Sequence, residues 1–281
     1  MSCAGLFRIT RPANAFVAGL AAIVAYLIAT GTIVPAALFL FVIVALITAA
    51  GNVINDYYDA EIDAINRPDR PVPSGTVTKS TAKSFAITLF LAGILVSFFT
   101  NPICIAIALV NSVILMYYAA KLKSTPFFGN LAVAYLSASI FLFGGALAGV
   151  TGLYHMLPVA AITLLAMLAR ELLKDAEDVE GDLAGGAQTL PIRIGVNATA
   201  RLAFIFAVLA VIASVVPGSW WGIGYLAGIF VVDCTILAAA LRVLCCTTPA
   251  CVKASGSTTF LKVGMFASLI VFTVSAVFLS G

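Results

Sequence analysis

Long apolar segments without charged residues make up most of this chain, and they restrict it to one kind of environment. Of its 281 residues, 62% are hydrophobic and only 10% are charged. A soluble globular protein normally carries about 25% charged residues. A water-soluble fold of this length has too little interior to hide so much apolar surface, so lipid must be the solvent for most of it.

The apolar segments have the length of membrane-spanning helices. An α-helix needs about 20 apolar residues to cross the hydrocarbon core, and turn signals such as Asn101-Pro102 separate several of the segments. The sequence therefore predicts an all-α membrane protein with one domain over residues 1–281 and nine transmembrane helices in a single bundle. The predicted spans are 13–31, 33–54, 83–100, 102–120, 127–150, 154–172, 199–216, 220–241 and 258–280.

The basic residues test this number of spans. With nine spans and the N-terminus inside, all fifteen Lys and Arg residues lie on or beside one side of the membrane. The opposite loops, around residues 31, 101, 152 and 218, contain no charged residue. Because Lys and Arg are enriched in cytoplasmic loops, the sequence predicts a multi-pass protein of the cell membrane with its charged side in the cytoplasm.

Eleven of the twelve acidic residues lie in two short clusters, 56–69 and 171–182. Each cluster follows an even-numbered span, so both face the cytoplasm, and the repeated unit suggests two halves meeting around a central cavity. On a helix that continues past the membrane surface, the polar side chains of each cluster form one stripe. The stripes consist of Asn52, Asn55, Asp56, Asp59 and Asp63, and of Glu171, Asp175, Asp178 and Asp182.

Stripes of this kind indicate a bound cation, because carboxylates on adjacent helical turns repel one another. Mg²⁺ takes oxygen ligands and typically combines one or two carboxylates with water and substrate phosphate oxygens. We therefore expect Mg²⁺ and a diphosphate between the two stripes. The alternative is a solvated polar helix end, whose acids pair with Arg67, Arg70, Arg170 and Lys174.

Basic residues on the same membrane face offer ligands for phosphate, because Lys and Arg bind it through charge-assisted hydrogen bonds. Arg67, between the first stripe and Pro68, is the best candidate for contacting a pyrophosphate. The others are Arg70, Lys79, Lys121, Lys123 and Lys174. Four lysines are expected only to set the orientation of the chain in the membrane, namely Lys79, Lys83, Lys253 and Lys262.

The remaining features carry less functional information. The six cysteines lack metal-ligand spacing, and most lie in apolar runs, where a free cysteine behaves as a small hydrophobe. Asp233 lies alone within a span and is left outside the site, although intramembrane acids are often functional. The net charge of +3 gives no indication of nucleic acid binding, and no obligatory protein partner is inferred.

The two acidic motifs resemble those of the UbiA superfamily of membrane prenyltransferases. Its first signature, N-x3-D-x3-D, matches Asn55, Asp59 and Asp63, and its second, D-x2-D-x3-D, matches Asp175, Asp178 and Asp182. The resemblance covers essentially the whole chain. It includes R-P-x-N at 11–14, Arg-Pro with P-S-G at 70–75, YYAAKLKSTPFFGN at 117–130 and TLPIRIG at 189–195.

The resemblance implies a cavity, a cofactor and roles for individual residues. Members of the superfamily have nine transmembrane helices around a large cavity, with Mg²⁺ bound by both motifs and a prenyl diphosphate bridging the ions. Catalytic roles would then fall to Asp59, Asp63, Asp178 and Asp182, with Tyr117 or Tyr118 near the allylic carbon. The metal ligands would be Asn55, Asp56, Asp59, Asp63, Asp175, Asp178 and Asp182. Substrate binding would fall to Asn14, Asn55, Arg67, Lys121, Lys123 and Lys174. Of these, Arg67 and Lys121 would hold the diphosphate oxygens, with Lys123 and Lys174 as second choices.

Within the superfamily, the stretches RPDRPVPSG and ARELLKDAEDVEGD are most similar to archaeal enzymes of ether-lipid synthesis. Those enzymes transfer geranylgeranyl from its diphosphate to the hydroxyl of 3-O-geranylgeranylglyceryl phosphate, so a lipid-like acceptor and contact with membrane lipid are expected. The alternative within the superfamily is an aromatic-acceptor prenyltransferase of the quinone or chlorophyll type. Outside it, a cation-binding transporter would need polar residues deep within several spans, and only Asp233 lies mid-span.

Overall fold

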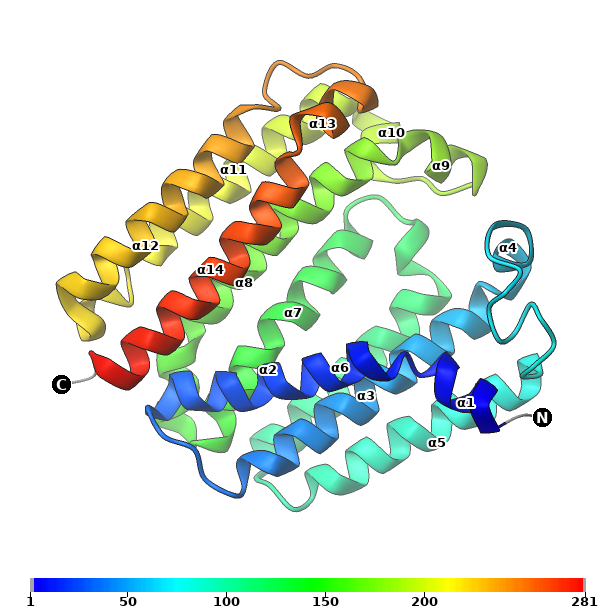
Figure 1. The fold of residues 1–281 in the computed structure, drawn as a ribbon, viewed down its shortest axis with the longest axis horizontal. Helices are drawn as coiled ribbons and strands as arrows, with labels where there is room; N and C mark the ends of the chain where they lie inside the picture. The colour runs from blue at the N-terminus through cyan, green and yellow to red at the C-terminus, as the bar shows by residue number, and fades with distance from the viewer. Residues whose placement is uncertain (1–2, 280–281) are drawn as a thin grey trace.

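The chain folds into a helical bundle in the computed structural model, which describes residues 3–279 (Figure 1). Within those residues, nine helices are long and apolar enough to cross a membrane, which confirms the predicted number. They are α2 (Pro12–Thr30), α3 (Ala37–Tyr58), α5 (Lys79–Ser97), α6 (Pro102–Ala120), α7 (Phe128–Leu147), α8 (Val150–Glu177), α11 (Val196–Ser214), α12 (Gly218–Leu241) and α14 (Ser257–Phe278).

Short helices gather at one end of the bundle, along the top and right of Figure 1. They are α1 (Cys3–Ile9), α4 (Ala60–Asn66), the 3₁₀ helix η1 (Leu122–Ser124), α9 (Val179–Ala184), α10 (Leu190–Ile194) and α13 (Pro249–Ser255). The loops at the opposite end, 31–36, 98–101, 148–149 and 215–217, contain no charged residue. The short helices and the charged connections therefore share one end, which we call the charged end.

Apolar side chains cover the outside of the bundle. Leu95, Phe230 and Ile270, from three different helices, are each about two-thirds exposed. Soluble monomers rarely expose contiguous apolar patches larger than a few hundred Å². A surface of this kind is suited to lipid, which agrees with the environment predicted from composition.

Several helix ends differ from the predicted ones for local reasons. α5 begins at Lys79 rather than 83, because the Thr78 hydroxyl accepts a hydrogen bond from the Thr81 N–H at 3.1 Å and caps the helix. α3 and α8 run past their predicted ends at 54 and 172, so the helices that cross the membrane also carry part of each acidic stripe. The predicted end of the last span, residue 280, lies outside the described residues.

The buried apolar residues form two clusters, one for each half of the chain. The first lies mainly among α2, α3, α5 and α6, and the second mainly among α8, α11, α12 and α14. α7 contributes to both, with Phe143 in the first cluster and Ala134 in the second. Figure 1 shows α7 between the two groups of helices. This arrangement agrees with the two halves expected from the repeated acidic motif.

A large cavity lies where the two halves meet. Its volume is about 440 Å³, and α2, α7, α8, α12 and α14 supply most of its walls. The lining is chiefly apolar, with residues such as Phe141, Met167 and Phe272. We call it the apolar cavity, and it provides the central cavity that the sequence predicted.

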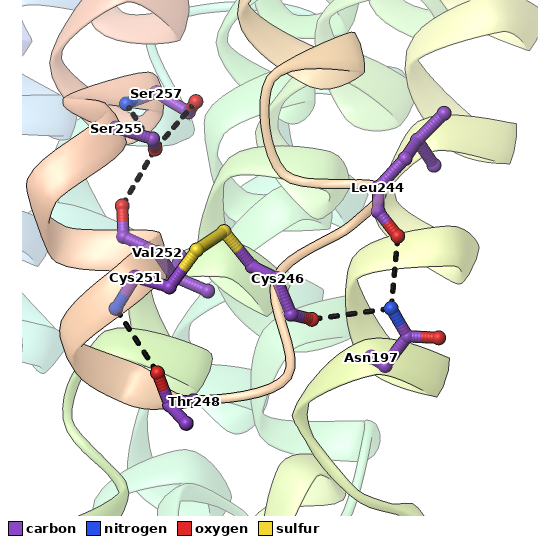
Figure 2. Close-up of a disulfide and its surroundings, with 8 residues drawn as sticks. All are labelled: Asn197, Leu244, Cys246, Thr248, Cys251, Val252, Ser255 and Ser257. Carbon is purple, nitrogen blue, oxygen red and sulfur yellow. Dashed lines mark hydrogen bonds between the residues drawn. A yellow bond between two sulfur atoms is a disulfide. The ribbon is translucent and has the colours of Figure 1, made fainter.

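Two cysteines depart from the expectation that they act as small hydrophobes. Cys246, in the connection between α12 and α13, forms a disulfide with Cys251 of α13 (Figure 2). The Asn197 amide fastens the same connection to α11 by donating to the carbonyl oxygens of Leu244 at 2.8 Å and Cys246 at 3.1 Å. The sequence did not predict this pair, because the cysteine spacing was compared only with metal-ligand patterns. The other four cysteines are free.

Candidate active site

The two acidic clusters lie at the charged end, where α3 passes into α4 and α8 passes into α9. Asp59 separates α3 from α4, and Asp178 separates α8 from α9. Backbone hydrogen bonds of the helical kind nevertheless continue through both residues. The Asp59 N–H donates to the Asn55 carbonyl at 2.8 Å, and the Asp182 N–H donates to the Asp178 carbonyl at 2.9 Å. The predicted stripes therefore exist as nearly continuous helical surfaces, with the same local construction in both motifs.

Arginines neutralise most of the first cluster. Asp56 is buried and accepts hydrogen bonds from Arg11 at 2.6 Å and from Arg70 at 3.4 Å. Arg70 also pairs with buried Asp63. The backbone of Arg11 has a φ of 51°, a left-handed conformation that a non-glycine residue rarely adopts. This part of the site matches the alternative of acids paired with neighbouring arginines.

The second cluster surrounds a polar cavity of about 180 Å³. Three predicted metal ligands line it, namely Asp175, Asp178 and Asp182. Neutral groups hold two of them: Asn130 Nδ2 donates to Asp175 at 2.8 Å, and the Thr189 hydroxyl donates to Asp182 at 3.0 Å. Burial raises the pKa of Asp182 above its usual range, although the Thr189 hydrogen bond lowers it. Fewer Lys and Arg side chains therefore pair with the acids of the second cluster than with those of the first.

Lys123 joins the two clusters. It lies on η1, forms an ion pair with Asp59 of the first cluster and lines the polar cavity of the second. Tyr118 also lines that cavity, whereas Tyr117 is 51% exposed and is absent from its lining. Of the two tyrosines left open by the sequence, the geometry therefore favours Tyr118.

The other predicted substrate-binding residues are divided between three places. Lys174 lines the polar cavity, and Asn14 lines the apolar cavity while its amide contacts Asn52 at 3.5 Å. Arg67 and Lys121 are exposed, and neither belongs to the lining of the two cavities. The structure thus brings Lys123 and Lys174 to the second cluster and leaves Arg67 and Lys121 outside it.

The polar and apolar cavities follow one another along the same two helices. On α7, Asn130 and Val133 line the polar cavity, and Ser137 and Phe141, on the following turns, line the apolar cavity. On α8 the order is reversed along the chain, with Arg170 lining the apolar cavity and Lys174 the polar one. A ligand with a charged head and an apolar tail could therefore place its head in the polar cavity and its tail in the apolar cavity.

A metal ion would find oxygen donors here, although they do not form a finished site. Among residues 3–279, no group of three His, Cys, Asp or Glu side chains is arranged to hold a metal. However, Asn55 Oδ1 is buried without a hydrogen-bond partner, and the neighbouring donors are carboxylates. This donor set fits Mg²⁺, which uses few protein ligands and completes its shell with water and phosphate oxygens.

Several side chains that organise these clusters had no site role predicted from the sequence, namely Arg11, Asn130 and Thr189. Arg70 had been considered only as one of several phosphate ligands or acid partners, and Glu171 only as a member of the second stripe. A signal was present for most of them. Arg11 opens the R-P-x-N stretch, Asn130 ends YYAAKLKSTPFFGN and Thr189 begins TLPIRIG.

Arg70 and Arg67 are predicted to differ in their effect on stability. We expect Arg70→Met to lower the free energy of unfolding by about 3 kcal/mol, because it leaves Asp63 buried without its cation. Arg67→Met, which removes an exposed arginine from the same loop, is the matched control. Thermal unfolding in detergent measures both, and equal midpoints for the two variants would contradict the assigned ion pairs.

Comparison with known proteins agrees with this architecture. The model of the UbiA prenyltransferase family matches residues 17–276. A digeranylgeranylglyceryl phosphate synthase from Methanoregula boonei is 67% identical over 279 residues, which cover 99% of this chain and 100% of that protein. A protein of the same name from Methanoculleus marisnigri is 59% identical over 278 residues, again covering 99% and 100%.

Solved structures give the same result for the fold. One from work on digeranylgeranylglyceryl phosphate synthase in membranes has a TM-score of 0.88 and 35% identity, and covers 97% of this chain and 98% of its own. A UbiA homologue from Archaeoglobus fulgidus bound to GPP and Mg²⁺ has a TM-score of 0.68 at 18% identity, covering 94% and 99%. The chain is therefore a multi-pass membrane protein that belongs to the UbiA prenyltransferase family.

Proposed function

We propose that this protein transfers a geranylgeranyl group from geranylgeranyl diphosphate to the hydroxyl of 3-O-geranylgeranylglyceryl phosphate, forming the second ether bond of archaeal membrane lipids. The observation that carries the prenyl transfer is the polar cavity, lined by carboxylates and lysines, directly followed by an apolar cavity on α7 and α8. The choice of acceptor is supported by the full-length similarity to synthases of this lipid.

The diphosphate of the donor would occupy the polar cavity. Lys123 and Lys174 would donate charge-assisted hydrogen bonds to its oxygens. We now prefer them to Arg67 and Lys121, which are exposed outside the cavity. The apolar tail of the donor would extend into the apolar cavity, where contact with hydrocarbon replaces contact with water.

A divalent metal, proposed as Mg²⁺, would be held between the motifs. The proposed ligands are Asn55, Asp56, Asp59, Asp63, Asp175, Asp178 and Asp182, directly or through water. When bound, the ion supplies positive charge that stabilises the leaving diphosphate. Arg11 and Arg70 would keep Asp56 and Asp63 in place in the first motif.

The protein side chains would then control a reaction with carbocation character. The allylic C–O bond breaks, the lysines stabilise the charge that develops on the diphosphate, and the acceptor oxygen bonds to C1 as its proton is lost. Tyr118 would place its ring near the allylic carbon, where an aromatic face stabilises positive charge. Enclosure by the helices would keep water from capturing the cation.

The site is proposed to face the cytoplasm, within a single domain over 1–281. The Lys and Arg residues lie at or near the charged end, and Lys and Arg favour cytoplasmic loops. Contacts of α7 with both apolar clusters support one domain rather than two.

The acceptor distinguishes this proposal from an aromatic-acceptor prenyltransferase. Membranes containing the protein would be given radiolabelled geranylgeranyl diphosphate, Mg²⁺ and either 3-O-geranylgeranylglyceryl phosphate or 4-hydroxybenzoate. We expect labelled product only with the glyceryl phosphate acceptor. Product only with the aromatic acid would replace the proposed function with the alternative.

The carboxylates of both motifs are expected to be required for turnover. Asp59→Asn and Asp178→Asn should each lower kcat by about 100-fold or more, the scale on which losing one electrostatic stabiliser acts. Glu61→Gln is the matched control, because this acid belongs to the first cluster but its side chain is 94% exposed and pairs with Lys79. Normal turnover in both Asp variants would remove the carboxylates from the mechanism.

Chelation tests the metal separately. EDTA should abolish turnover and added Mg²⁺ should restore it, because the acids of the polar cavity have mainly neutral partners in the protein. EDTA already saturated with Mg²⁺ serves as the control for nonspecific inhibition. Turnover that survives prolonged chelation would rule out the proposed divalent ion.

A further inference from the structure

The apolar cavity contains two cations that the reaction described above does not use. Arg170 of α8 and Lys262 of α14 both line it, among walls that are otherwise mostly aliphatic and aromatic. Charged groups beside hydrocarbon are costly unless an opposite charge or hydrogen-bonding partners compensate them. Two such groups in one cavity therefore indicate an anionic ligand.

Both cations lie near the charged end of the cavity. Arg170 is about two turns before the end of α8 at Glu177, and Lys262 is about one and a half turns after the start of α14 at Ser257. Asn14, in the first turn of α2, lines the same cavity. Since α14 packs against both α2 and α8, the three polar side chains come from neighbouring helices at one mouth of the cavity.

The protein leaves part of the hydrogen-bonding capacity of these cations unused. Lys262 is exposed, and it forms no ion pair or side-chain hydrogen bond with the residues between 3 and 279. Arg170 pairs with Glu171, but its Nε is buried without a hydrogen-bond partner. A role in membrane topology alone would not require Lys262 to line the same cavity as an arginine whose Nε has no hydrogen-bond partner.

Asp233 lines the same cavity but does not neutralise Arg170 or Lys262. Asp233 accepts a hydrogen bond from Ser214 at 2.7 Å and, within the described part of the chain, forms no salt bridge with Arg170 or Lys262. Glu171, the partner of Arg170, lines the polar cavity instead. Arg170 therefore stands at the boundary between the two cavities, with positive charge on the apolar side.

We propose that Arg170 and Lys262, assisted by Asn14, bind the phosphate group of the lipid acceptor. This inference rests on the proposed function and assigns the part of the site that selects a phosphorylated acceptor. The donor diphosphate has its own cations in Lys123 and Lys174. In the acceptor, the phosphate and the free hydroxyl are on neighbouring carbons. A phosphate held by Arg170 therefore keeps that hydroxyl beside the polar cavity, where C1 of the donor would lie.

The decisive comparison uses the acceptor with and without its phosphate. Lys262→Gln and Arg170→Gln should each raise the KM for 3-O-geranylgeranylglyceryl phosphate about tenfold or more, as expected for the loss of a charge-assisted hydrogen bond. The KM for geranylgeranyl diphosphate should stay unchanged. The preference for the phosphorylated acceptor over geranylgeranylglycerol should fall by the same factor, and Lys262→Arg should retain it.

Lys253→Gln is the matched control, since it removes an exposed lysine at the same end of the bundle that lines neither cavity. Because Lys262 is exposed, Lys262→Gln is expected to fold, and it can still be assayed if Arg170→Gln does not fold. A higher KM for the donor with an unchanged acceptor preference would assign these cations to the diphosphate and overturn the proposal.

Acceptor binding measured without donor separates this proposal from the proposed function. Titration of wild-type protein in detergent should show tighter binding of the phosphorylated acceptor than of geranylgeranylglycerol, and Lys262→Gln should remove the difference. Equal binding of both lipids by the wild-type protein would overturn the phosphate site. Absence of ether product from a protein that binds the phosphorylated acceptor selectively would instead overturn the proposed function alone.

Discussion

Compensation of negative charge at the end of a lipid-embedded bundle is the constraint on which the rest of the site depends. Carboxylates beside hydrocarbon need a cation or several hydrogen-bond donors. The first cluster obtains its cations from the protein, because Arg70 pairs with Asp56 and Asp63 and Lys123 pairs with Asp59. Asp175 and Asp182 instead receive an amide and a hydroxyl. This asymmetry places the greater need for an external cation at the second cluster.

The same helices then divide the interior into a charged and an apolar region. α7 and α8 line both cavities, so the spacing of side chains along them sets where one ends and the other begins. Arg170 and Glu171 are consecutive residues, yet they line different cavities. An amphiphilic substrate can therefore be positioned by its own polarity, with its charge near the protein surface and its chain between the two halves of the bundle.

Most of the fold and part of the site could be predicted from the sequence. The nine spans followed from segment length and hydropathy, and the distribution of Lys and Arg fixed which ends lie together. The acidic motifs and Lys123 were recognised from their spacing and from family resemblance. Arg67 was preferred to Arg70 because it stands next to the first stripe. Adjacency along the chain does not reveal which side chain turns inward, and the structure shows Arg70 paired while Arg67 is exposed.

The sequence by itself determined that this chain spans a membrane with nine helices and carries two acidic helical stripes on one side. Both follow from local properties, namely hydropathy and the helical repeat. Only the tertiary structure decided which acids are already neutralised, which tyrosine enters the polar cavity, and that Arg170, Lys262 and Asn14 share one mouth. These relations join residues far apart in the chain through the packing of separate helices, so no local pattern encodes them.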